Sequence, residues 1–463
     1  MASFQERTDN FLRWFKSLPG AFFSDAIEIV DLRARNAGRG IIATRNIPAE
    51  TTLFTIPRRA IISVDSSRLR ELLPSLFESQ GDGDDEQPLD SWSGLIMVLI
   101  HEHLNGDSSA WRPYFGVLPE TFDTPMFWSD DELSELQASA MRSKIGKAEA
   151  EHMFRTKLLP AFRQRPDIFP SSNDYSDEQF FQMAHMVGST IMAYAFDLEN
   201  DEAEEENGDE WVEDREGKSL IGMVPMADIL NADAEFNVHV NHGDDSLTVT
   251  TLRRIHAGEE IMNYYGPHPN SELLRRYGYV TEKHSRHDVV EIPWLTVLST
   301  LVDHLGIPQQ TLEQALERID DEELEDSFVL ERGSAEPNSE GTFVGPAAIE
   351  EMPADLQEQL KLVLKSLQKM DESLLPDKRK RDEALQAIML KTILTIESWY
   401  STTSAEDERL LLQNGPCARR NAAVLVRLGE KRLLNEAKEF LCGLAEDLPT
   451  DGSSPQKRAR RDA

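Results

Sequence analysis

Tyrosine side chains gather in one short stretch of the chain, and they are the first residues that suggest a chemical site. Four of the eight tyrosines lie between positions 264 and 279, close to two glycines. Core packing explains one or two such rings, whereas four rings beside glycines are typical of the wall of a binding site. Tyrosine hydroxyls also donate and accept hydrogen bonds. We therefore expect Tyr264, Tyr265, Tyr277 and Tyr279 to line a site.

An asparagine at the end of an apolar run is the second candidate. The run Met223–Leu230 ends at Asn231, and Ala232 and Asp233 follow. A buried asparagine can fix a loop through its amide and present backbone groups to a ligand. The alternative, a helix that ends at Asn231 and is followed by a turn, fits these residues about equally well.

The third candidate is the tripeptide Gly38-Arg39-Gly40, which lies between two predicted strands. Two glycines allow the backbone to approach a ligand closely or to turn with positive φ. No third glycine and no helix follow, so the tripeptide is not the fingerprint of a dinucleotide site. Most such tripeptides are ordinary turns, and that interpretation would hold here if no other segment supported a site.

The elements that must position these residues are short strands and one short helix. Ser271 as an N-cap and Gly278 as a stop predict a helix between them. β-branched stretches bounded by turn residues predict strands. The predicted strands are 26–32, 40–44, 51–56, 60–64, 238–240, 247–251 and 260–262.

Helical periodicity dominates elsewhere. A first helix carries Phe11 and Phe15 and ends near Pro19, and helical spacing returns over 92–196. Residues 333–345 are predicted to form a loop between helices. The helices predicted from residue 295 onward are 295–305, 311–319, 356–370, 383–400 and 421–444.

These elements predict an α+β protein with six consecutive regions. The order is a β unit that is split by a helical insert and followed by a helical domain. The insert contains a strongly acidic loop, 199–216, that cannot bury a core. The regions are an N-terminal helix (1–24), the first core segment (25–64), the insert (65–217), the second core segment (218–291), the helical domain (292–448) and a basic tail (449–463).

Composition excludes several classes of protein. The formal net charge of −35 repels phosphate backbones, so we expect no direct nucleic-acid ligand and instead a basic protein as partner. Two cysteines exclude a disulfide framework or a cysteine-rich zinc cluster. The longest apolar run, 94–100, is too short to span a bilayer. We expect a soluble, intracellular, monomeric protein with no membrane contact and no metal.

Two basic clusters bear on location in the cell. Lys378–Arg381 falls inside the predicted helical domain, where a solvated charged face is the simpler interpretation. Lys457–Arg461 lies in the predicted tail, where an import receptor can reach it. We therefore expect a nuclear protein, with the cytoplasm as a second location.

Taken in order, the segments resemble the SET-domain protein-lysine methyltransferases of the class related to plant Rubisco large-subunit methyltransferase. Each motif alone is of modest specificity, but the ordered set is highly specific and runs from about residue 25 to about residue 444. Within the class the chain is most similar to the fungal ribosomal lysine methyltransferases and their vertebrate nuclear relative. The segments are 37–43, 47–50, 111–115, 126–128, 192–196, 224–231, 264–279 and 426–433.

This resemblance implies a fold and a cofactor. The fold is a β-rich SET core of short strands in a knot-like arrangement, split by the helical insert, and then an all-α substrate-binding domain. The cofactor is S-adenosylmethionine. By resemblance, Tyr265 is the catalytic residue. The cofactor-binding residues are Gly38, Arg39, Gly40, Tyr194, Asn231, Ala232, Tyr277 and Tyr279, of which Tyr279 covers the adenine and Tyr194 and Tyr277 lie between cofactor and lysine.

Three further residues are candidates for the substrate groove, namely Trp92, Ala195 and Asp197. For Trp92, packing in the core is at least as good an interpretation, and Asp197 is also explained as the start of the acidic loop. One departure from the class is visible, since Asn231 is followed by Ala232 where the class has histidine. In the family that residue acts mainly through its backbone, which alanine also supplies.

The resemblance favours methylation of a lysine in a large-subunit ribosomal protein. One alternative is a nuclear methyltransferase that acts on histones or on a transcription factor. Another, of a different class, is a SET-fold binding scaffold without turnover. The presence of Tyr265 argues against the scaffold.

Overall fold

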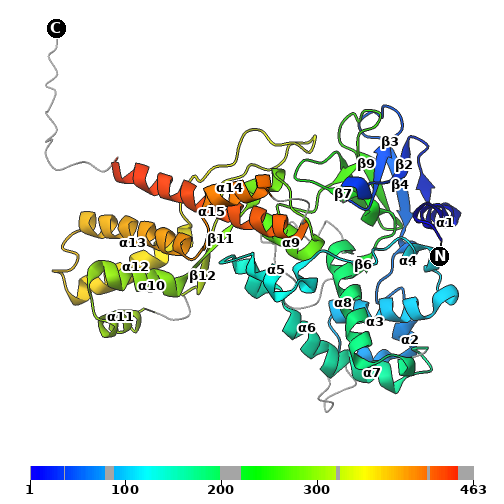
Figure 1. Ribbon diagram of the computed structural model, residues 1–463, viewed down its shortest axis with the longest axis horizontal. Coiled ribbons are helices and arrows are strands. Elements are labelled where there is room, and N and C mark those ends of the chain that lie inside the picture. The colour runs from blue at the N-terminus through cyan, green and yellow to red at the C-terminus, as the bar shows by residue number, and fades with distance from the viewer. Residues whose placement is uncertain are drawn as a thin grey trace, which may run out of the picture. The chain divides into compact units, whose positions relative to one another are not determined.

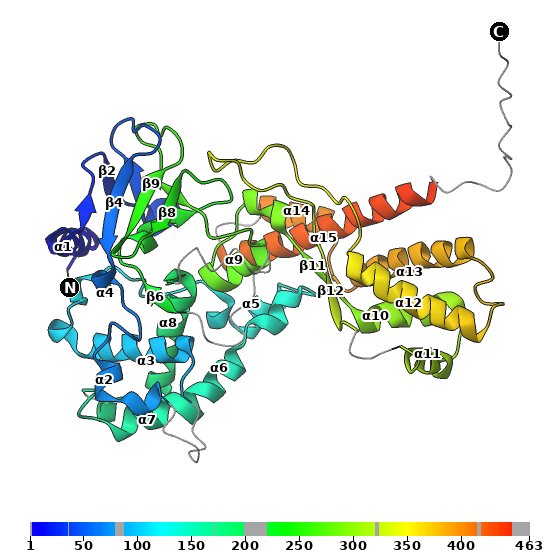
Figure 2. The same ribbon diagram turned by 180° about the vertical axis from the view of Figure 1, so that it is seen from behind.

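The computed structural model describes residues 2–35, 37–78, 88–170, 172–198, 220–319, 324–413 and 418–446. The chain divides into two compact units (Figures 1 and 2). Unit 1 comprises Met1–Leu133, Ser143–Ser285 and Ala335–Pro346, and unit 2 comprises Ser134–Arg142, Arg286–Ser334 and Ala347–Ala463. Each unit therefore includes one short segment from the middle of the other's stretch of chain. The expected acidic loop, the basic tail and Cys417 lie outside the described residues.

Unit 1 is built around a four-stranded antiparallel sheet. Alternating burial along its strands, with Leu247 and Val249 facing inward, follows from the two-residue repeat of a strand. The sheet joins strands that are about 200 residues apart in the chain, since β4 pairs with β9. Its order is β1 (Phe22–Phe23), β4 (Thr52–Pro57), β9 (Ser246–Thr251) and β8 (Val238–His242).

Among the described residues of unit 1, three two-stranded pairs accompany this sheet. Two are antiparallel, and the third, between β7 and β10, is parallel and very short. The pairs are β2 (Ile27–Asp31) with β3 (Arg39–Ala43), β5 (Ala195–Asp197) with β6 (Ile221–Met223), and β7 (Asn231–Ala232) with β10 (Met262–Asn263).

Helices form the rest of unit 1. A capping box at Ser3 starts α1 (Phe4–Ser17), which buries Phe11 and Phe15. Helices α3 (Ser91–Leu104) and α8 (Asp177–Tyr194) lie side by side in both views. The shorter helices are α2 (Leu69–Leu72), α4 (Arg112–Phe115), α5 (Asp130–Ser134), α6 (Lys147–Met153), α7 (Leu159–Gln164) and α9 (Asn270–Tyr277).

Unit 2 is mainly helical, and α10, α12 and α13 lie side by side (Figures 1 and 2). The expectation of an all-α domain needs a correction, because β11 (Val290–Pro293) pairs with β12 (Ser327–Leu330). The alternating Phe328 and Leu330 of β12 are buried, but four residues are too few to reveal a strand by pattern. The helices are α10 (Trp294–Leu305), α11 (Gln309–Leu316), α12 (Ala354–Met370), α13 (Lys378–Ser398), α14 (Ser404–Gln413) and α15 (Ala418–Glu446).

Two local predictions were wrong. No strand covers 60–64, where Arg58–Ala60 is a 3-10 turn and Ile62 makes a single bridge to Met223. Ser271 does not cap α9, which begins at Asn270 after Pro269. The Asn270 side chain instead accepts a hydrogen bond from the Thr281 N–H at 2.9 Å, so the start of α9 is fixed by a residue beyond its end.

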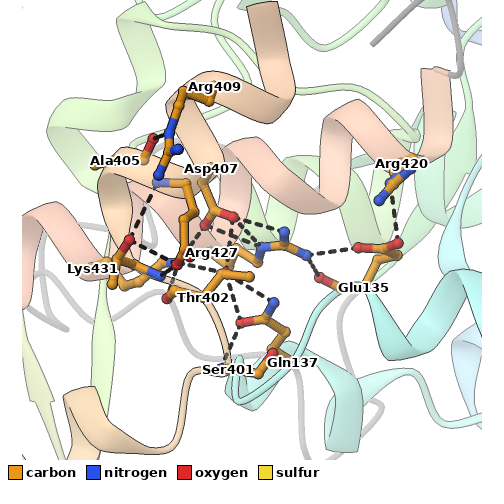
Figure 3. Close-up of polar contacts among 12 residues, drawn as sticks. Glu135, Gln137, Ser401, Thr402, Ala405, Asp407, Arg409, Arg420, Arg427 and Lys431 are labelled. Atoms are coloured by element: carbon orange, nitrogen blue, oxygen red, sulfur yellow. Dashed lines mark hydrogen bonds and ion pairs between the residues drawn. The ribbon is translucent and has the colours of Figure 1, made fainter. Parts of the chain in front are cut away.

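Two charged residues of the late motif 426–433, Arg427 and Lys431, face the interior of unit 2 (Figure 3). The Arg427 guanidinium donates to Asp407 Oδ1 at 2.8 Å and to Glu135 Oε2 at 2.9 Å. Lys431 pairs with the same Asp407 carboxylate and donates to the Thr402 carbonyl at 2.9 Å. Helix α15 thereby holds both α14 and the segment Ser134–Arg142 in unit 2.

Helix α15 also carries a buried acid, Glu430, one turn after Arg427. The Ser139 hydroxyl donates to Glu430 at 2.5 Å, and the Tyr400 hydroxyl donates to it at 2.8 Å. Burial, with a smaller contribution from the charges of Asp288 and Glu291, raises the pKa of Glu430 to about 8. Glu430 is therefore largely protonated at neutral pH and adds no full charge to the interior.

Candidate active site

The Tyr265 hydroxyl is bound to backbone. It donates to the Leu230 carbonyl at 2.8 Å, and its ring stacks on Tyr277 with centroids 4.8 Å apart and planes 24° apart. Burial raises the pKa of Tyr265 well above its usual value, so the hydroxyl keeps its proton. Since that single proton goes to Leu230, the lone pairs of the oxygen remain available to accept.

The rings of Tyr277 and Tyr279 extend the same wall. Their centroids are 6.1 Å apart, and burial raises the pKa of Tyr277 to about 12. The Tyr279 hydroxyl donates to the Ala232 carbonyl at 3.4 Å. Tyr264 belongs elsewhere, because its ring stacks on Phe236 at 4.6 Å. Adjacent residues of an extended segment point to opposite sides, so three of the four tyrosines form the wall.

Asn231 joins three distant segments of unit 1. Its Nδ2 donates to the Arg39 carbonyl at 3.2 Å and to Glu260 Oε1 at 2.7 Å. It lies in a β strand after a 3-10 turn, so the alternative of a helix ending at Asn231 is wrong. Glu260 was missed as a site residue, since a carboxylate after a turn is most often solvated.

The hydrogen bonds that Asn231 makes to Arg39 and Glu260 require a glycine at position 40. A Cβ at position 40 would lie 2.4 Å from Leu32 Cδ1 and 2.9 Å from both Asn231 Nδ2 and Glu260 Oε1. Gly38 differs, because its φ of +63° is left-handed and no heavy atom lies within 4 Å of where its Cβ would be. Backbone next to open space, at a residue without a side chain, suits close approach by a ligand.

The Arg39 side chain is used inside the protein. It donates to Thr8 Oγ1 and to the Val117 carbonyl, both at 2.9 Å, and its guanidinium lies over the Phe4 ring at 3.8 Å. Burial, together with the charges of the neighbouring Arg7 and Arg33, lowers the pKa of Arg39 to about 10. Position 39 can therefore serve a ligand through its backbone, while its side chain ties β3 to α1.

Asp228 and Tyr114 are site residues that the sequence reasoning missed. Asp228 lies in the buried 3-10 turn Ala227–Ile229, and the Tyr114 hydroxyl donates to its Oδ2 at 2.5 Å. Burial raises the pKa of Asp228 to about 7. The available signal was a lone acid inside the apolar run Met223–Leu230, because a buried carboxyl needs donors.

The remaining candidates lie on α3, α8 and β5. Tyr194 ends α8, and burial together with the charge of Asp228 raises its pKa to about 12. Ala195 pairs with Met223 and the exposed Asp197 pairs with Ile221, so β5 runs beside the strand that leads into the Asn231 turn. A Cβ at Gly188 of α8 would lie 3.1 Å from the Trp92 ring, which favours the packing interpretation of Trp92.

The arrangement provides oxygen acceptors among aromatic rings. Within the described ranges no group of three or more His, Cys, Asp or Glu side chains is arranged to hold a metal ion. No helix among the described residues is long and apolar enough to cross a membrane. Hydroxyl and carbonyl oxygens in a ring-lined site are suited to holding an amine or a polarised methyl group through N–H···O and C–H···O contacts.

Comparisons with known proteins agree with this geometry. A family model described as SET domain matches residues 38–266, and one described as Rubisco LSMT substrate-binding matches residues 336–434. Ribosomal lysine N-methyltransferase 4 of Saccharomyces cerevisiae is 35% identical over 69% of this chain and 63% of its own length. N-lysine methyltransferase setd6 of Xenopus laevis is 28% identical over 87% of this chain and 88% of its own length.

A solved structure shares the fold. The SET domain of LSMT bound to lysine and AdoHcy superimposes with a TM-score of 0.63 at 19% identity, and the match covers 96% of this chain and 93% of that one. At this identity the likeness establishes the fold alone. The alignment with the yeast relative covers less than two thirds of that protein's length.

Proposed function

This chain belongs to the SET-domain protein-lysine N-methyltransferases of the class related to Rubisco large-subunit methyltransferase, and we propose that it transfers the methyl group of S-adenosylmethionine to a lysine of a basic protein. The observation that carries the proposal is the hydrogen bond from Tyr265 to the Leu230 carbonyl, one residue before Asn231. It supports the assignment of Tyr265 as the catalytic tyrosine.

The first task of the site is to hold a neutral amine. A lysine amine has a pKa near 10.4 in water, so only about 0.04% of it is neutral at pH 7, and only that form attacks a methyl carbon. The rings of Tyr265 and Tyr277 are partly buried and remove water from their surroundings. Desolvation disfavours the ammonium form and increases the reactive fraction.

The second task is to bind the cofactor. We propose that Gly38 and Gly40 approach it with bare backbone, that Asn231 and Ala232 present the backbone of β7, and that Tyr279 covers the adenine ring. When bound, S-adenosylmethionine supplies a methyl group on a positively charged sulfur. These segments form the proposed cofactor cradle. It has room for a bulky ligand at Gly38, because no heavy atom lies within 4 Å of the position that a Cβ would take there.

The third task is alignment. The Tyr265 hydroxyl donates its hydrogen bond to the Leu230 carbonyl, so the lone pairs of its oxygen can accept a C–H···O contact from the methyl group during transfer. Stacking on Tyr277 fixes the ring, which keeps that oxygen in one place. Alignment of amine, methyl and sulfur is chiefly a matter of positioning, and it needs neither a nucleophilic side chain nor a metal.

For the substrate we propose a lysine of a large-subunit ribosomal protein. The name of the yeast relative and the net charge of −35 both support a basic protein target, because opposite charges speed encounter. A second candidate is a non-ribosomal nuclear protein such as a histone or a transcription factor. It is favoured by the setd6 relatives, whose similarity extends over more of both chains.

The test compares these substrates directly. Purified full-length chain and its Tyr265→Phe variant are incubated with methyl-labelled S-adenosylmethionine and with large ribosomal subunits, core histones or a nuclear extract. We expect label in a large-subunit protein with the wild type and far less with Tyr265→Phe. Label only in histones or nuclear proteins would support the second candidate, and cofactor binding without label in any fraction would support a scaffold.

We also propose a nuclear location, which the basic residues Lys457–Arg461 support. The other basic cluster is less suited to a receptor, because Arg379 and Lys380 lie in the first turn of α13 and pair with Glu383. A fluorescent fusion should concentrate in the nucleus and should lose that concentration when residues 449–463 are removed. Unchanged nuclear fluorescence after removal would contradict the role of the tail.

A further inference from the structure

We propose that Asp228 is a positioning residue for Tyr265. Its carboxylate and Tyr114 together hold the turn that presents the Leu230 carbonyl to the Tyr265 hydroxyl, and loss of the carboxylate's charge loosens that turn. The role rests on the proposed function, since it concerns the tyrosine at the methyl-transfer site.

The Asp228 carboxylate has a donor on each oxygen. Oδ2 accepts from the Tyr114 hydroxyl at 2.5 Å, and Oδ1 accepts from the Met226 N–H at 3.1 Å. Met226 has a φ of 89°, a conformation that residues with side chains rarely adopt. A strained residue persists only when its surroundings fix it, and here the fixing group is Asp228.

The same turn ends at the acceptor of Tyr265. The Asp228 N–H donates to the Val224 carbonyl at 3.3 Å, and the Leu230 N–H donates to the Ala227 carbonyl at 3.1 Å. The Leu230 carbonyl then accepts from Tyr265 at 2.8 Å. The buried carboxylate therefore lies only two positions before the carbonyl that orients the catalytic hydroxyl.

Tyr114 is a firm support for this turn. It is fully buried at 0% exposure, and its ring lies 6.1 Å from the ring of Phe11. A hydroxyl that cannot reach water must keep its hydrogen bond to Asp228. The support comes from α4, which is remote in sequence from both the turn and Tyr265.

Asp228 is the group here that changes charge near neutral pH. Burial raises its pKa to about 7, and the hydrogen bond from Tyr114 keeps that pKa lower than burial alone would. The titratable groups facing it are Tyr114 on α4, Tyr194 on α8 and Tyr265 after β10. Burial raises the pKa of each above its usual value, so all three stay neutral between pH 6 and 9.

The direction of the effect follows from hydrogen bonding. Above pH 7 both carboxylate oxygens accept strongly from Tyr114 and Met226. Below pH 7 one oxygen carries a proton and becomes a poor acceptor, so one of the two bonds weakens. The rate of methyl transfer should therefore fall as pH drops through about 7, in addition to any fall caused by protonation of the substrate lysine.

Single-turnover rates from pH 5.5 to 9, on one substrate, separate these contributions. Asp228→Asn keeps the shape of the side chain and cannot titrate, so the rate change near pH 7 should disappear. Tyr114→Phe removes the bond that lowers the pKa, so the change should move up by about one pH unit. A purely structural role would lower the rate equally at every pH. An unmoved rate change in both variants would overturn the proposal.

A second readout needs no turnover. In full-length protein labelled with ¹³Cζ-tyrosine, the Tyr265 resonance, identified by its loss in Tyr265→Phe, should shift with a midpoint near pH 7. The shift should vanish in Asp228→Asn and persist in Glu430→Gln, which removes the buried acid of unit 2. A Tyr265 resonance that does not respond to pH would overturn the proposal even in an active enzyme. A responsive resonance in a protein that methylates nothing would instead contradict the proposed function.

Discussion

The side-chain amide of Asn231 donates to the carbonyl of Arg39, which lies 192 residues earlier in the chain, at 3.2 Å. The same nitrogen donates to Glu260, 29 residues later, at 2.7 Å. One side chain thus joins the glycine loop, the Asn231 turn and the segment that leads to Tyr265. Because the proposed cofactor cradle consists of these three segments, its geometry depends on this amide.

Asn231→Ala should therefore weaken cofactor binding about tenfold or more. It leaves the Arg39 carbonyl and the Glu260 carboxylate without their donor, which costs about 1–3 kcal/mol of stability. Isothermal titration with S-adenosylmethionine and chemical denaturation measure the two effects. Asn241→Ala is the control, because Asn241 also makes two amide hydrogen bonds in unit 1, within the β8–β9 pair. Equal loss of affinity in both variants would contradict a specific role for Asn231.

The two glycines of the loop should respond differently to alanine. Gly40→Ala forces a methyl group onto Leu32, Asn231 and Glu260, and we expect about 1–3 kcal/mol of destabilisation and loss of cofactor binding. Gly38→Ala has room for the methyl group and should lose about 1 kcal/mol through its positive φ. Thermal unfolding and titration of the two variants test this order, and the reverse order would refute the described packing of Gly40.

The carboxylate of Asp407 should contribute far more to the stability of unit 2 than the carboxylate of the neighbouring Glu408. Asp407→Asn leaves the buried Lys431, which is 2% exposed, without its anion and leaves Arg427, which is 1% exposed, with Glu135 alone, so it should cost about 3–5 kcal/mol. Glu408→Gln breaks the exposed pair with Arg432 and should change stability by about 0–1 kcal/mol. Denaturant unfolding of both variants provides the comparison. Similar small effects would mean that the buried cluster does not hold the segment Ser134–Arg142.

Glu430 should make stability depend on pH in a defined window. Its folded pKa, about 8, lies above the ordinary value of 4.5, so the folded state holds the proton more tightly. The wild type is then most stable relative to Glu430→Gln below about pH 4.5. As the pH rises from about 4.5 to about 8, the unfolding free energy of the wild type should fall relative to that variant by up to about 1.4 kcal/mol per pH unit. A difference in unfolding free energy that is flat from pH 5 to 8 would show that Glu430 is ionised throughout.

Helices and strands with a clear apolar repeat could be predicted from the sequence. The helices expected at 295–305 and 356–370 are confirmed as α10 and α12, and the strand expected at 247–251 is confirmed as β9. Each has a clear apolar repeat. The short strand β12 and helix α14 were not predicted, since β12 is too short for a repeat and α14 buries only Asp407 among its described positions.

The buried polar contacts could not be predicted from the sequence. Arg427 and Lys431 have the helical spacing of an ordinary solvated face, and charged residues are rarely fully buried, so an inward orientation was not expected. Tyr114 and Asp228 bond across 114 residues, and no local pattern reports such a pair. The tyrosine wall was predictable because four rings crowd one stretch, although only the structure shows that Tyr264 stacks on Phe236 instead.

The Tyr265 hydroxyl is proposed to align the methyl transfer. The most direct test measures single-turnover methylation and S-adenosylmethionine affinity for the wild type and Tyr265→Phe, a change that removes one oxygen and keeps the ring stacked on Tyr277. We predict a rate lower by roughly 10²-fold or more, comparable to losing one preorganised polar group, with affinity little changed. An unaltered rate, or a loss confined to cofactor affinity, would contradict the account.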